Sequence, residues 1–462
     1  MRDFVNHVHL VGIGGIGMSG IAEVLLHQGF EISGSDLQAG IITDRLETAG
    51  ATIRIGHAAE NINGADVVVT SSAVSSDNPE VREARVRNIP LVQRAEMLGE
   101  LMRFKQGIAI AGTHGKTTTT SLVASVLATA GMDPTFIVGG VVNSVRSNAR
   151  LGDGDHLVAE ADESDASFLH LHPQMAVVTN IDADHMETYD GNFDRLVETY
   201  EAFLRNLPFY GLAFLCNEDP VLSRLADRIH TPVIRYGLAE PAEVFARGIS
   251  QSGRTSTFEV VAFGESLDTF ELALPGQHNV LNALAAIAIA LKLGIDAAHI
   301  KTALKQFEGI GRRFESLGRI KIPDGEFELV DDYAHHPSEL RATLQAARDC
   351  WPDRRLVPVF QPHRYSRTRD LFDDFAQLLS EVDHLVVTEV YAAGESPLPA
   401  SDGRSLCRAI RRRGKDPIFV EGLDTLSATL QNLVQPDDVV LTLGAGDIGR
   451  FARNLSVSGV LT

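Results

Sequence analysis

The chain has 462 residues, more than one hydrophobic core usually holds, and this length favours two to four domains. Its formal net charge of −20 argues against a role dominated by nucleic acid or anionic membrane, because both reward an excess of Lys and Arg. The three cysteines, Cys216, Cys350 and Cys407, are too scattered for a metal site or a disulfide framework, so we expect packing residues in a reducing cytoplasm.

The N-terminal part of the chain predicts a parallel α/β sheet. The first twenty residues lack a basic segment followed by an apolar run, so we expect no signal peptide. From residue 8 to about 105, short β-rich runs such as VHLVG alternate with helical stretches such as MSGIAEVLLHQG. This alternation is typical of strands joined by crossover helices.

A glycine turn directly follows the first predicted strand. Gly12, Gly14 and Gly17 form G-x-G-x-x-G, where backbone N–H groups and a helix N-terminus approach a diphosphate closely. Asp36 follows at the position of a ribose-binding acid. However, any tight strand-to-helix turn needs glycines, and a second copy of the pattern occurs at residues 444–449. The pattern therefore predicts turn geometry and leaves the ligand open.

The second block opens with a phosphate-binding pattern at residues 107–131. A strand is predicted to end at Ala111, a loop to turn through Gly112 and Gly115, and a helix to begin at Lys116 and stop at Gly131. In such a loop the lysine reaches the β and γ phosphates, and the hydroxyl of the next residue binds Mg²⁺. Ile110 stands where the strict motif has a glycine. A Thr-rich helix start is the alternative, but it gives the lysine no use.

Acidic residues follow the next two predicted strands, in HLVAEADESD and TNIDADHMETYDG. Carboxyl ends of parallel strands share one edge of a sheet, so we expect some of these acids to reach the nucleotide and most to be solvated. The candidates are Glu160, Asp162, Glu163, Asp165, Asp182 and Asp184, with His185 beside them.

Further polar clusters lie downstream. His278, Asn279 and Asn282 stand at the start of a predicted core helix, either as ligands or as its N-cap. A third α/β block begins near Leu317. Two loops after its strands suit carboxylate or phosphate binding, although a solvated surface loop explains either one alone. Their residues are Asp332, Tyr333, His335 and His336, and then His363, Arg364, Tyr365, Arg367 and Arg369.

In this order, the motifs resemble the Mur ligase family of peptidoglycan synthesis. The similarity runs from VGIGGIGMSGIA through GTHGKTTTT, AEADESDASF, PGQHNVLNALAA, DDYAHHP and QPHRYSRTRDL to GAGDIG. The resemblance implies an α/β protein of three domains. Residues 1–105 would be a Rossmann-like UDP-sugar domain, residues 106–314 a central P-loop ATPase with a parallel or mixed sheet, and residues 315–462 a Rossmann-like domain that closes over ATP and the amino acid.

The resemblance is strongest to members that join L-alanine to UDP-N-acetylmuramate through an acyl phosphate. It implies ATP and two Mg²⁺ ions as cofactors, small-molecule substrates, and no nucleic-acid partner or membrane insertion. The resemblance does not indicate an oligomeric state. A recycling ligase that attaches a tripeptide to the same UDP-sugar is the nearest alternative. An NAD-dependent oxidoreductase leaves the phosphate loop unexplained, and a nucleotide switch leaves the third block unexplained. The glycine-rich N-terminal block disfavours folylpolyglutamate synthetase.

The resemblance also implies roles for single residues. Lys116, His185, Arg313 and Arg364 would be catalytic. ATP would contact Gly112, Thr113, His114, Gly115, Lys116, Thr117, Thr118, His278, Asn279, Asn282 and Asp332. The UDP-sugar would contact Gly14, Gly15, Ile16, Gly17, Asp36, His57, Ser71 and Ser72. L-Alanine would contact Tyr333, His335, Arg364 and Arg367. Mg²⁺ would be held by Thr117, Glu160 and His185.

One departure concerns the second metal ion. Several Mur ligases carry a carbamylated lysine shortly after the residue matched by His185. Here no lysine occurs between Thr117 and Leu291, and arginine cannot take its place because its guanidinium stays protonated. We therefore expect the second Mg²⁺ to depend on His185, substrate oxygens and water.

Overall fold

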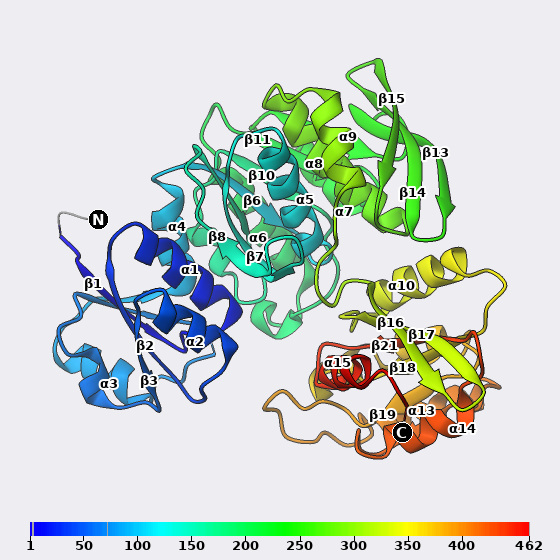
Figure 1. Cartoon of the computed structure of the whole chain (residues 1–462). Helices are drawn as coiled ribbons and strands as arrows, with labels where there is room; N and C mark the ends of the chain where they lie inside the picture. Colours follow the sequence, from blue (N-terminus) through cyan, green and yellow to red (C-terminus); the bar gives the residue numbers. More distant parts are fainter. Residues whose placement is uncertain (2–3, 72, 462) are drawn as a thin grey trace. The chain divides into compact units, whose positions relative to one another are not determined.

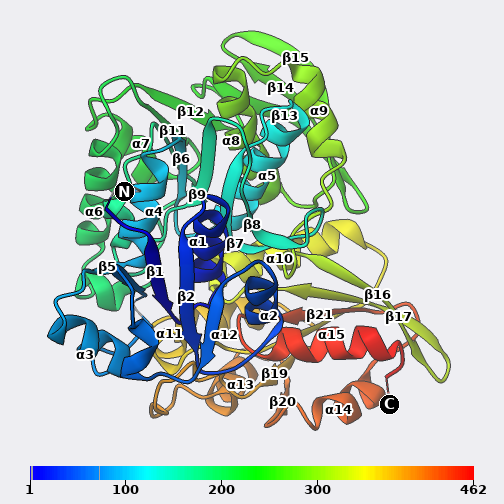
Figure 2. The same ribbon diagram turned by 60° about the vertical axis from the view of Figure 1, so that its left-hand side comes forward.

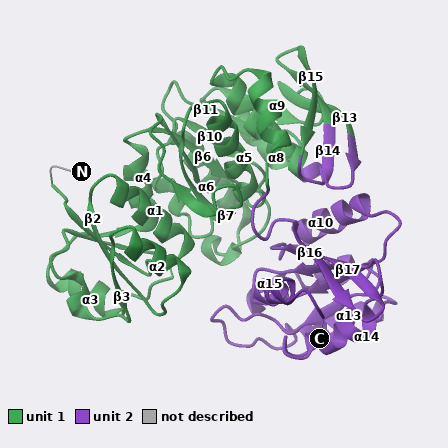
Figure 3. Cartoon of the chain, viewed as in Figure 1, with its two compact units in different colours: residues 1–249, 258–272, 279–308 green, residues 250–257, 273–278, 309–462 purple. Residues whose placement is uncertain are grey.

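The computed structural model describes residues 1, 4–71 and 73–461. The chain divides into two compact units (Figure 3). The first unit comprises residues 1–249, 258–272 and 279–308, and the second comprises residues 250–257, 273–278 and 309–462. Three sheets of five, ten and six strands confirm the predicted α/β class.

The N-terminal sheet is parallel, in the order β3-β2-β1-β4-β5 (Figure 1). The chain order reverses at β1, and open α/β sheets bind ligands beyond the carboxyl end of the strand at such a point. The glycine turn of residues 12–17 lies there. The strands are β1 (His7–Val11), β2 (Glu31–Asp36), β3 (Thr52–Ile55), β4 (Val67–Thr70) and β5 (Leu91–Gln93). The helices are α1 (Ile16–His27), α2 (Ile41–Thr48), η1 (Ala59–Ile62), α3 (Pro79–Val86) and α4 (Arg94–Met102).

The central sheet has the order β15-β14-β13-β12-β11-β10-β6-β9-β7-β8. Within this sheet, β6 pairs in parallel with β9 on one side and β10 on the other. The loops that follow these three strands therefore meet at one edge. The strands are β6 (Gln106–Ala111), β7 (Thr135–Val142), β8 (Ser147–Arg150), β9 (His156–Glu160), β10 (Met175–Val178), β11 (Leu212–Cys216), β12 (Val233–Gly237), β13 (Val244–Ser252), β14 (Thr255–Ala262) and β15 (Glu265–Leu272).

Helices of the same block cover this sheet. The core helix α8 buries every residue from Ala283 to Ala290, as its apolar sequence predicts. The chain has no described helix that is long and apolar enough to cross a membrane. The helices are α5 (Lys116–Thr129), η2 (Ser167–His170), η3 (Met186–Tyr189), α6 (Phe193–Arg205), α7 (Pro220–Ala226), α8 (Gln277–Lys292) and α9 (Ala297–Lys305).

Strands β12 to β15 form one side of the central sheet and were not predicted. Many of their residues are polar and only partly buried, so the strands lack the continuous apolar run of a buried parallel strand. Helix α1 of the N-terminal block contacts β7 and β8 at the other side of this sheet (Figure 2). Within that contact, Nδ2 of Asn148 donates a 2.6 Å hydrogen bond to the carbonyl of Ile16.

The second unit contains the six-stranded sheet β16-β17-β21-β18-β19-β20. Strand β16 is an antiparallel edge strand, and the other strands run parallel. Apolar clusters pack on both faces. The only tryptophan, Trp351, follows α10 and stacks on Phe314 at 5.9 Å between ring centroids. The strands are β16 (Glu315–Ile322), β17 (Gly325–Asp332), β18 (Leu356–Phe360), β19 (Val386–Thr388), β20 (Ile418–Val420) and β21 (Val439–Leu443). The helices are α10 (Pro337–Cys350), α11 (Tyr365–Asp370), α12 (Phe372–Leu379), α13 (Gly403–Arg412), α14 (Leu426–Leu433) and α15 (Ile448–Ser458).

A buried carboxylate, Glu80, joins α3 to the strands of the N-terminal sheet. It accepts hydrogen bonds from Ser35 Oγ at 2.6 Å and from Asn61 Nδ2 at 2.5 Å, and the His9 ring lies 3.7 Å away. Glu80 and His9 are both fully buried. Burial alone would raise the pKa of the Glu80 carboxyl, but its contacts with His9, Ser35 and Asn61 outweigh burial and lower the pKa to about 2.

We predict that Glu80→Gln loosens the N-terminal sheet in a pH-dependent way. A folded pKa of about 2 against 4.5 in the unfolded chain contributes about 3 kcal/mol above pH 4.5, and this is lost as the pH falls through 2. Amide hydrogen exchange of β1 and β2 should become about 100-fold faster at pH 7 and about tenfold faster at pH 3. Glu83→Gln, which removes a partly exposed ion-pair partner of Arg87 from the same helix, is the control. Equal acceleration at both pH values would contradict the prediction.

Candidate active site

The phosphate loop connects β6 to α5 through two glycines with positive φ, 125° at Gly112 and 82° at Gly115. A Cβ at Gly112 would collide with the side chain of Thr179, and a Cβ at Gly115 would lie 2.5 Å from Oδ1 of Asn282. No side chain caps the N-terminus of α5. The first turn of this helix therefore presents backbone N–H groups, which suits a phosphate.

Hydrogen bonds fasten this loop to the segment after β10. The N–H of His114 donates to Oδ1 of Asn180 at 2.8 Å, and the N–H of Asp182 donates to the Thr113 hydroxyl at 2.9 Å. The His114 ring lies 3.1 Å from the Asp182 carboxylate. These bonds hold the loop in shape without a ligand, as a preorganised binding site requires.

Asn282 supports the loop from α8. Its Oδ1 accepts a 3.2 Å hydrogen bond from the hydroxyl of Thr119, and its Nδ2 donates to Asn279 Oδ1 at 3.2 Å. Asn279 and Asn282 are both buried. Asn282 therefore contacts the protein beneath the loop, and its expected contact with a nucleotide stays a prediction.

Glu163 holds the phosphate-loop lysine. Nζ of Lys116 donates to both carboxylate oxygens of Glu163, at 3.0 and 2.7 Å, and also to the carbonyls of Gly112 and Thr113. Glu163 is 2% exposed, and the Tyr189 hydroxyl donates to its backbone carbonyl. Sequence analysis named Glu163 among the acids but gave it no role, since spacing does not show which acid faces the lysine.

The buried pair has shifted pKa values. Burial opposes the charge on Lys116, but the negative charges of Glu163, Asp162 and Glu160 together outweigh burial and raise the pKa of the ammonium. Burial raises the pKa of the Glu163 carboxyl to about 7, against the opposing effect of Lys116. Glu163 is therefore poised to gain or lose a proton near neutral pH.

The three candidate metal ligands come from the loops and strand ends at one edge of the central sheet. Thr117 is the second residue of α5 and is buried. Glu160 ends β9, and its Oε1 accepts a 2.6 Å hydrogen bond from the N–H of Gly139. His185 follows β10 with φ of 53°, and its ring lies 3.6 Å from Asp184. The Thr117 hydroxyl and the Glu160 carboxylate are hard oxygen donors of the kind that Mg²⁺ prefers, and these two donors fit this ion. His185 offers a ring nitrogen instead.

The candidate UDP-sugar residues gather at the carboxyl edge of the N-terminal sheet. The N–H of Gly14 donates to the Asp36 carboxylate at 2.9 Å, and Gly15 precedes α1, which begins at Ile16. His57 follows β3 and contacts Ser35 at 3.0 Å, and Ser71 directly follows β4. Ser72 lies outside the described residues.

The candidate amino-acid residues meet around His363 in the second unit. The His335 ring lies edge-on to Tyr333 at 5.3 Å and to His363 at 5.7 Å. Nη1 of Arg367 lies 3.2 Å from Nδ1 of His363, and Arg364 follows it with φ of 67°. His363 also stacks on Tyr391 at 5.6 Å. The sequence placed His363 in a loop suited to carboxylate or phosphate binding but did not assign it to L-alanine. Tyr391 was not predicted, because it lies in a loop without a recognisable motif.

Three remaining candidates also lie in the second unit. Both carboxylate oxygens of Asp332 accept backbone hydrogen bonds, from Phe314 at 2.6 Å and Ala334 at 2.8 Å, and burial raises its pKa to about 6. Burial also lowers the pKa of His278 to about 4. The Arg313 guanidinium lies 5.0 Å from the Tyr333 ring centre. These two hydrogen bonds hold the backbone at Phe314 and at Ala334, which directly follows Tyr333, so Asp332 has a structural role in this loop. Its contact with a ribose stays a prediction.

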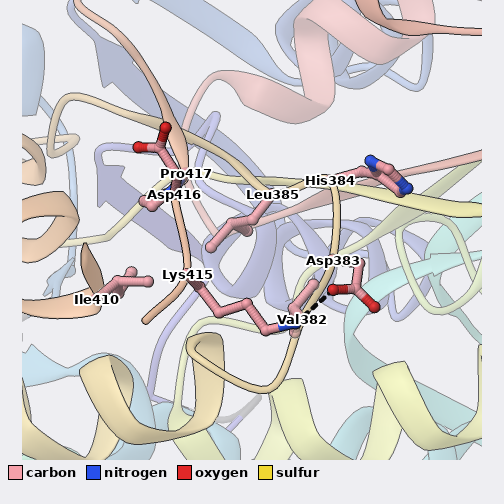
Figure 4. Close-up of a pocket in the computed structure, with 8 residues that line it drawn as sticks. All are labelled: Val382, Asp383, His384, Leu385, Ile410, Lys415, Asp416 and Pro417. Carbon is pink, nitrogen blue, oxygen red and sulfur yellow. Dashed lines mark hydrogen bonds and ion pairs between the residues drawn. The ribbon is translucent and has the colours of Figure 1, made fainter. Parts of the chain in front are cut away.

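A cavity of about 250 Å³ lies elsewhere in the second unit (Figure 4). Val382–Leu385 and Lys415–Pro417 line it, just before β19 and β20 begin. It is therefore at the amino edge of the sheet, whereas His363 follows β18 at the carboxyl edge. Lys415 and Asp383, which both line the cavity, form an ion pair. Because the cavity and His363 lie at opposite edges of the sheet, we do not assign the cavity to the active site.

Comparisons with known proteins agree along the chain. Residues 7–106 match the family model for the catalytic domain of the Mur ligase family, residues 110–290 match the Mur ligase middle domain, and residues 312–446 match the Mur ligase glutamate ligase domain. A curated UDP-N-acetylmuramate–L-alanine ligase of Halorhodospira halophila is 58% identical over 452 residues, which cover 98% of this chain and 93% of the relative.

Solved structures show the same fold. The UDP-N-acetylmuramate-alanine ligase of Thermotoga maritima matches with a TM-score of 0.82 and 33% identity, over 98% of each chain. A murein peptide ligase of Psychrobacter arcticus matches with a TM-score of 0.71 and 24% identity, again over 98% of each chain, which shows the fold alone. From its domain matches and its identity with these relatives, the chain belongs to the Mur ligase family.

Proposed function

We infer that this protein joins L-alanine to the carboxylate of UDP-N-acetylmuramate at the expense of ATP, in peptidoglycan precursor synthesis. The 58% identity with the Halorhodospira halophila ligase over nearly the whole chain carries this inference. A phosphate loop with an uncapped helix N-terminus and a buried lysine supports the use of ATP. The matched relatives and the donor set of the central sheet support Mg²⁺ as the metal.

The chemistry explains why ATP is needed. A carboxylate is a poor electrophile. Its oxygen attacks the γ-phosphorus of ATP, which releases ADP and gives an acyl phosphate, and the amine of L-alanine then displaces inorganic phosphate to form the amide. The protein contributes positioning and charge neutralisation. Bound Mg²⁺ would neutralise phosphate charge.

We propose the following division of labour. Residues 1–105 bind the UDP-sugar, residues 106–314 bind ATP, and residues 315–462 bring the amino acid. Lys116 neutralises the γ-phosphate, while Thr117 and Glu160 hold one Mg²⁺ and His185 a second. Gly112–Thr118, His278, Asn279, Asn282 and Asp332 face ATP, and Arg313 reaches a phosphate. Tyr333, His335, Arg364 and Arg367 bind L-alanine. The residues at the carboxyl edge of the N-terminal sheet bind the UDP-sugar.

We also propose that the reaction takes place in the cytoplasm. The three cysteines are free and buried, as expected of packing residues in a reducing compartment.

A coupled phosphate-release assay tests the function. UDP-N-acetylmuramate and ATP would be offered with L-alanine, glycine, L-serine or the tripeptide of the recycling pathway. Release that depends on L-alanine supports the proposal. Release with the tripeptide alone would assign the protein to the recycling ligases instead.

We predict that Lys116→Ala folds normally but loses turnover by about 10³-fold or more, because a fixed charge at the transferred phosphoryl group has this effect. The exposed Lys292 provides the matched control, Lys292→Ala, with turnover unchanged. Circular dichroism would check the fold, and initial rates of phosphate release would check the activity. Near-normal turnover by Lys116→Ala would contradict the ATP site.

We predict that His185→Ala lowers the apparent affinity for Mg²⁺ by about tenfold or more, because a metal ligand is lost. A Mg²⁺ titration of the initial rate is the measurement. His170→Ala, which changes a more exposed histidine of η2, should leave the titration unchanged.

The same titration in CO₂-depleted buffer tests the absence of a carbamate ligand. Added bicarbonate should leave the rate unchanged, since no lysine lies between Thr117 and Leu291. Stimulation by bicarbonate would show that a carbamate forms on another residue.

We predict that MgATP binds more weakly as the pH rises from 6 to 8. Glu163, with a pKa of about 7, ionises over this range, and its negative charge opposes the incoming phosphates. Binding thus takes up a proton, so affinity falls by at most about tenfold per pH unit. Calorimetry at constant Mg²⁺ would measure this, and Glu163→Gln should flatten the dependence relative to wild type. Asp165→Asn is the control, and an equally steep dependence in Glu163→Gln would refute the role of Glu163.

A further inference from the structure

Arg94 lies at the glycine turn of the N-terminal sheet. It begins α4 directly after β5, and because all five strands are parallel, it emerges at the same edge as the turn after β1. A Cβ built on Gly17 would lie 3.1 Å from Cδ of Arg94 and 3.2 Å from its Nη1. The guanidinium therefore lies directly against the turn.

A positive charge beside this turn would strengthen its hold on a diphosphate. Residues 12–17 are glycines and isoleucines, and the N–H of Gly14 already donates to the carboxylate of Asp36. Asp36 adds negative charge where a diphosphate would bring more. Backbone dipoles offer only partial charges. A guanidinium offers a full charge and a planar set of donors that matches phosphate oxygens.

The guanidinium of Arg94 has N–H groups available to donate hydrogen bonds to a ligand. Its Nη2 lies 3.8 Å from Oδ2 of Asp162, which is an ion-pair distance beyond hydrogen-bond range, and its side chain is 21% exposed. In the parts of the chain that the structure describes, the guanidinium makes no hydrogen bond. A charged group this close to the turn and held by one distant carboxylate can accept a phosphate partner.

We propose that Arg94 binds the diphosphate of the UDP-sugar at the turn of residues 12–17. This inference rests on the proposed function, because it concerns the same UDP-sugar. It adds a link between the substrates, since Asp162, the partner of Arg94, directly precedes Glu163, the partner of Lys116. One short acidic segment thus contacts both a cation of the UDP-sugar site and the cation of the phosphate loop.

The competing explanation is that Arg94 only joins the N-terminal block to the central one through Asp162. A partly exposed ion pair at 3.8 Å, without a hydrogen bond, contributes little to stability. The two explanations differ in which ligand loses affinity, because a diphosphate contact affects only ligands that carry phosphate.

Calorimetry on the full chain separates them. Wild type, Arg94→Ala and Arg94→Lys would be titrated with UDP-N-acetylmuramate and UDP, and with uridine in competition with UDP. Arg94→Ala should bind UDP-N-acetylmuramate and UDP about tenfold or more weakly, with uridine and MgATP within twofold of wild type. Arg94→Lys should recover part of the loss. Arg103→Ala, which changes an exposed arginine at the end of the same helix, should bind as wild type does.

Two results would overturn the proposal. The first is wild-type affinity of Arg94→Ala for UDP. The second is an equal loss of UDP affinity in Asp162→Asn, which would assign the effect to the ion pair. If wild type itself fails to bind UDP-N-acetylmuramate, the proposed function is wrong. If wild type binds it and Arg94→Ala binds equally well, only the inference about Arg94 is wrong.

Discussion

Close packing around the phosphate loop is the constraint on which the central sheet depends. Gly112 turns against Thr179 of the neighbouring strand end, and Gly115 turns against Asn282 of the buried helix α8. Neither position has room for a Cβ atom. The loop is therefore fixed by its own sheet and core before any ligand arrives, and Lys116 is fixed with it. Its ammonium is held by two loop carbonyls and by a buried carboxylate.

Strand order explains how residues far apart in the sequence reach this loop. In both the N-terminal and the central sheet, the glycine loop follows the strand at which the order reverses. Neighbouring parallel strands then deliver their own loops to the same edge. Asp36 and Ser71 reach one turn in this way, and Glu160 and His185 approach the other. In the proposed function, the same principle serves two different phosphate groups, so the glycine pattern alone does not identify its ligand.

The sequence predicted the elements with strong patterns and missed those without them. Strands such as β1, β4, β6, β9 and β10, the start of α5 and the buried helix α8 follow from apolar runs and glycines. Strands β12 to β15 escaped because their residues are half polar. Contacts between individual side chains could not be predicted from the sequence, for a different reason. The acid that faces Lys116 depends on how the chain turns after Glu160, and the position of Arg94 against Gly17 depends on the packing of α4. The spacing of residues in the sequence reveals neither of these two contacts.

The stacking of Trp351 on Phe314 gives the protein an optical property. All tryptophan emission comes from this one indole, because the chain has a single tryptophan. Phe314 adjoins Arg313, and its backbone donates to the carboxylate of Asp332. Fluorescence of the unmodified protein therefore reports on the surroundings of Phe314 and Asp332. If a nucleotide contacts Asp332 or Arg313, as we propose, we expect the emission spectrum to change without any attached dye.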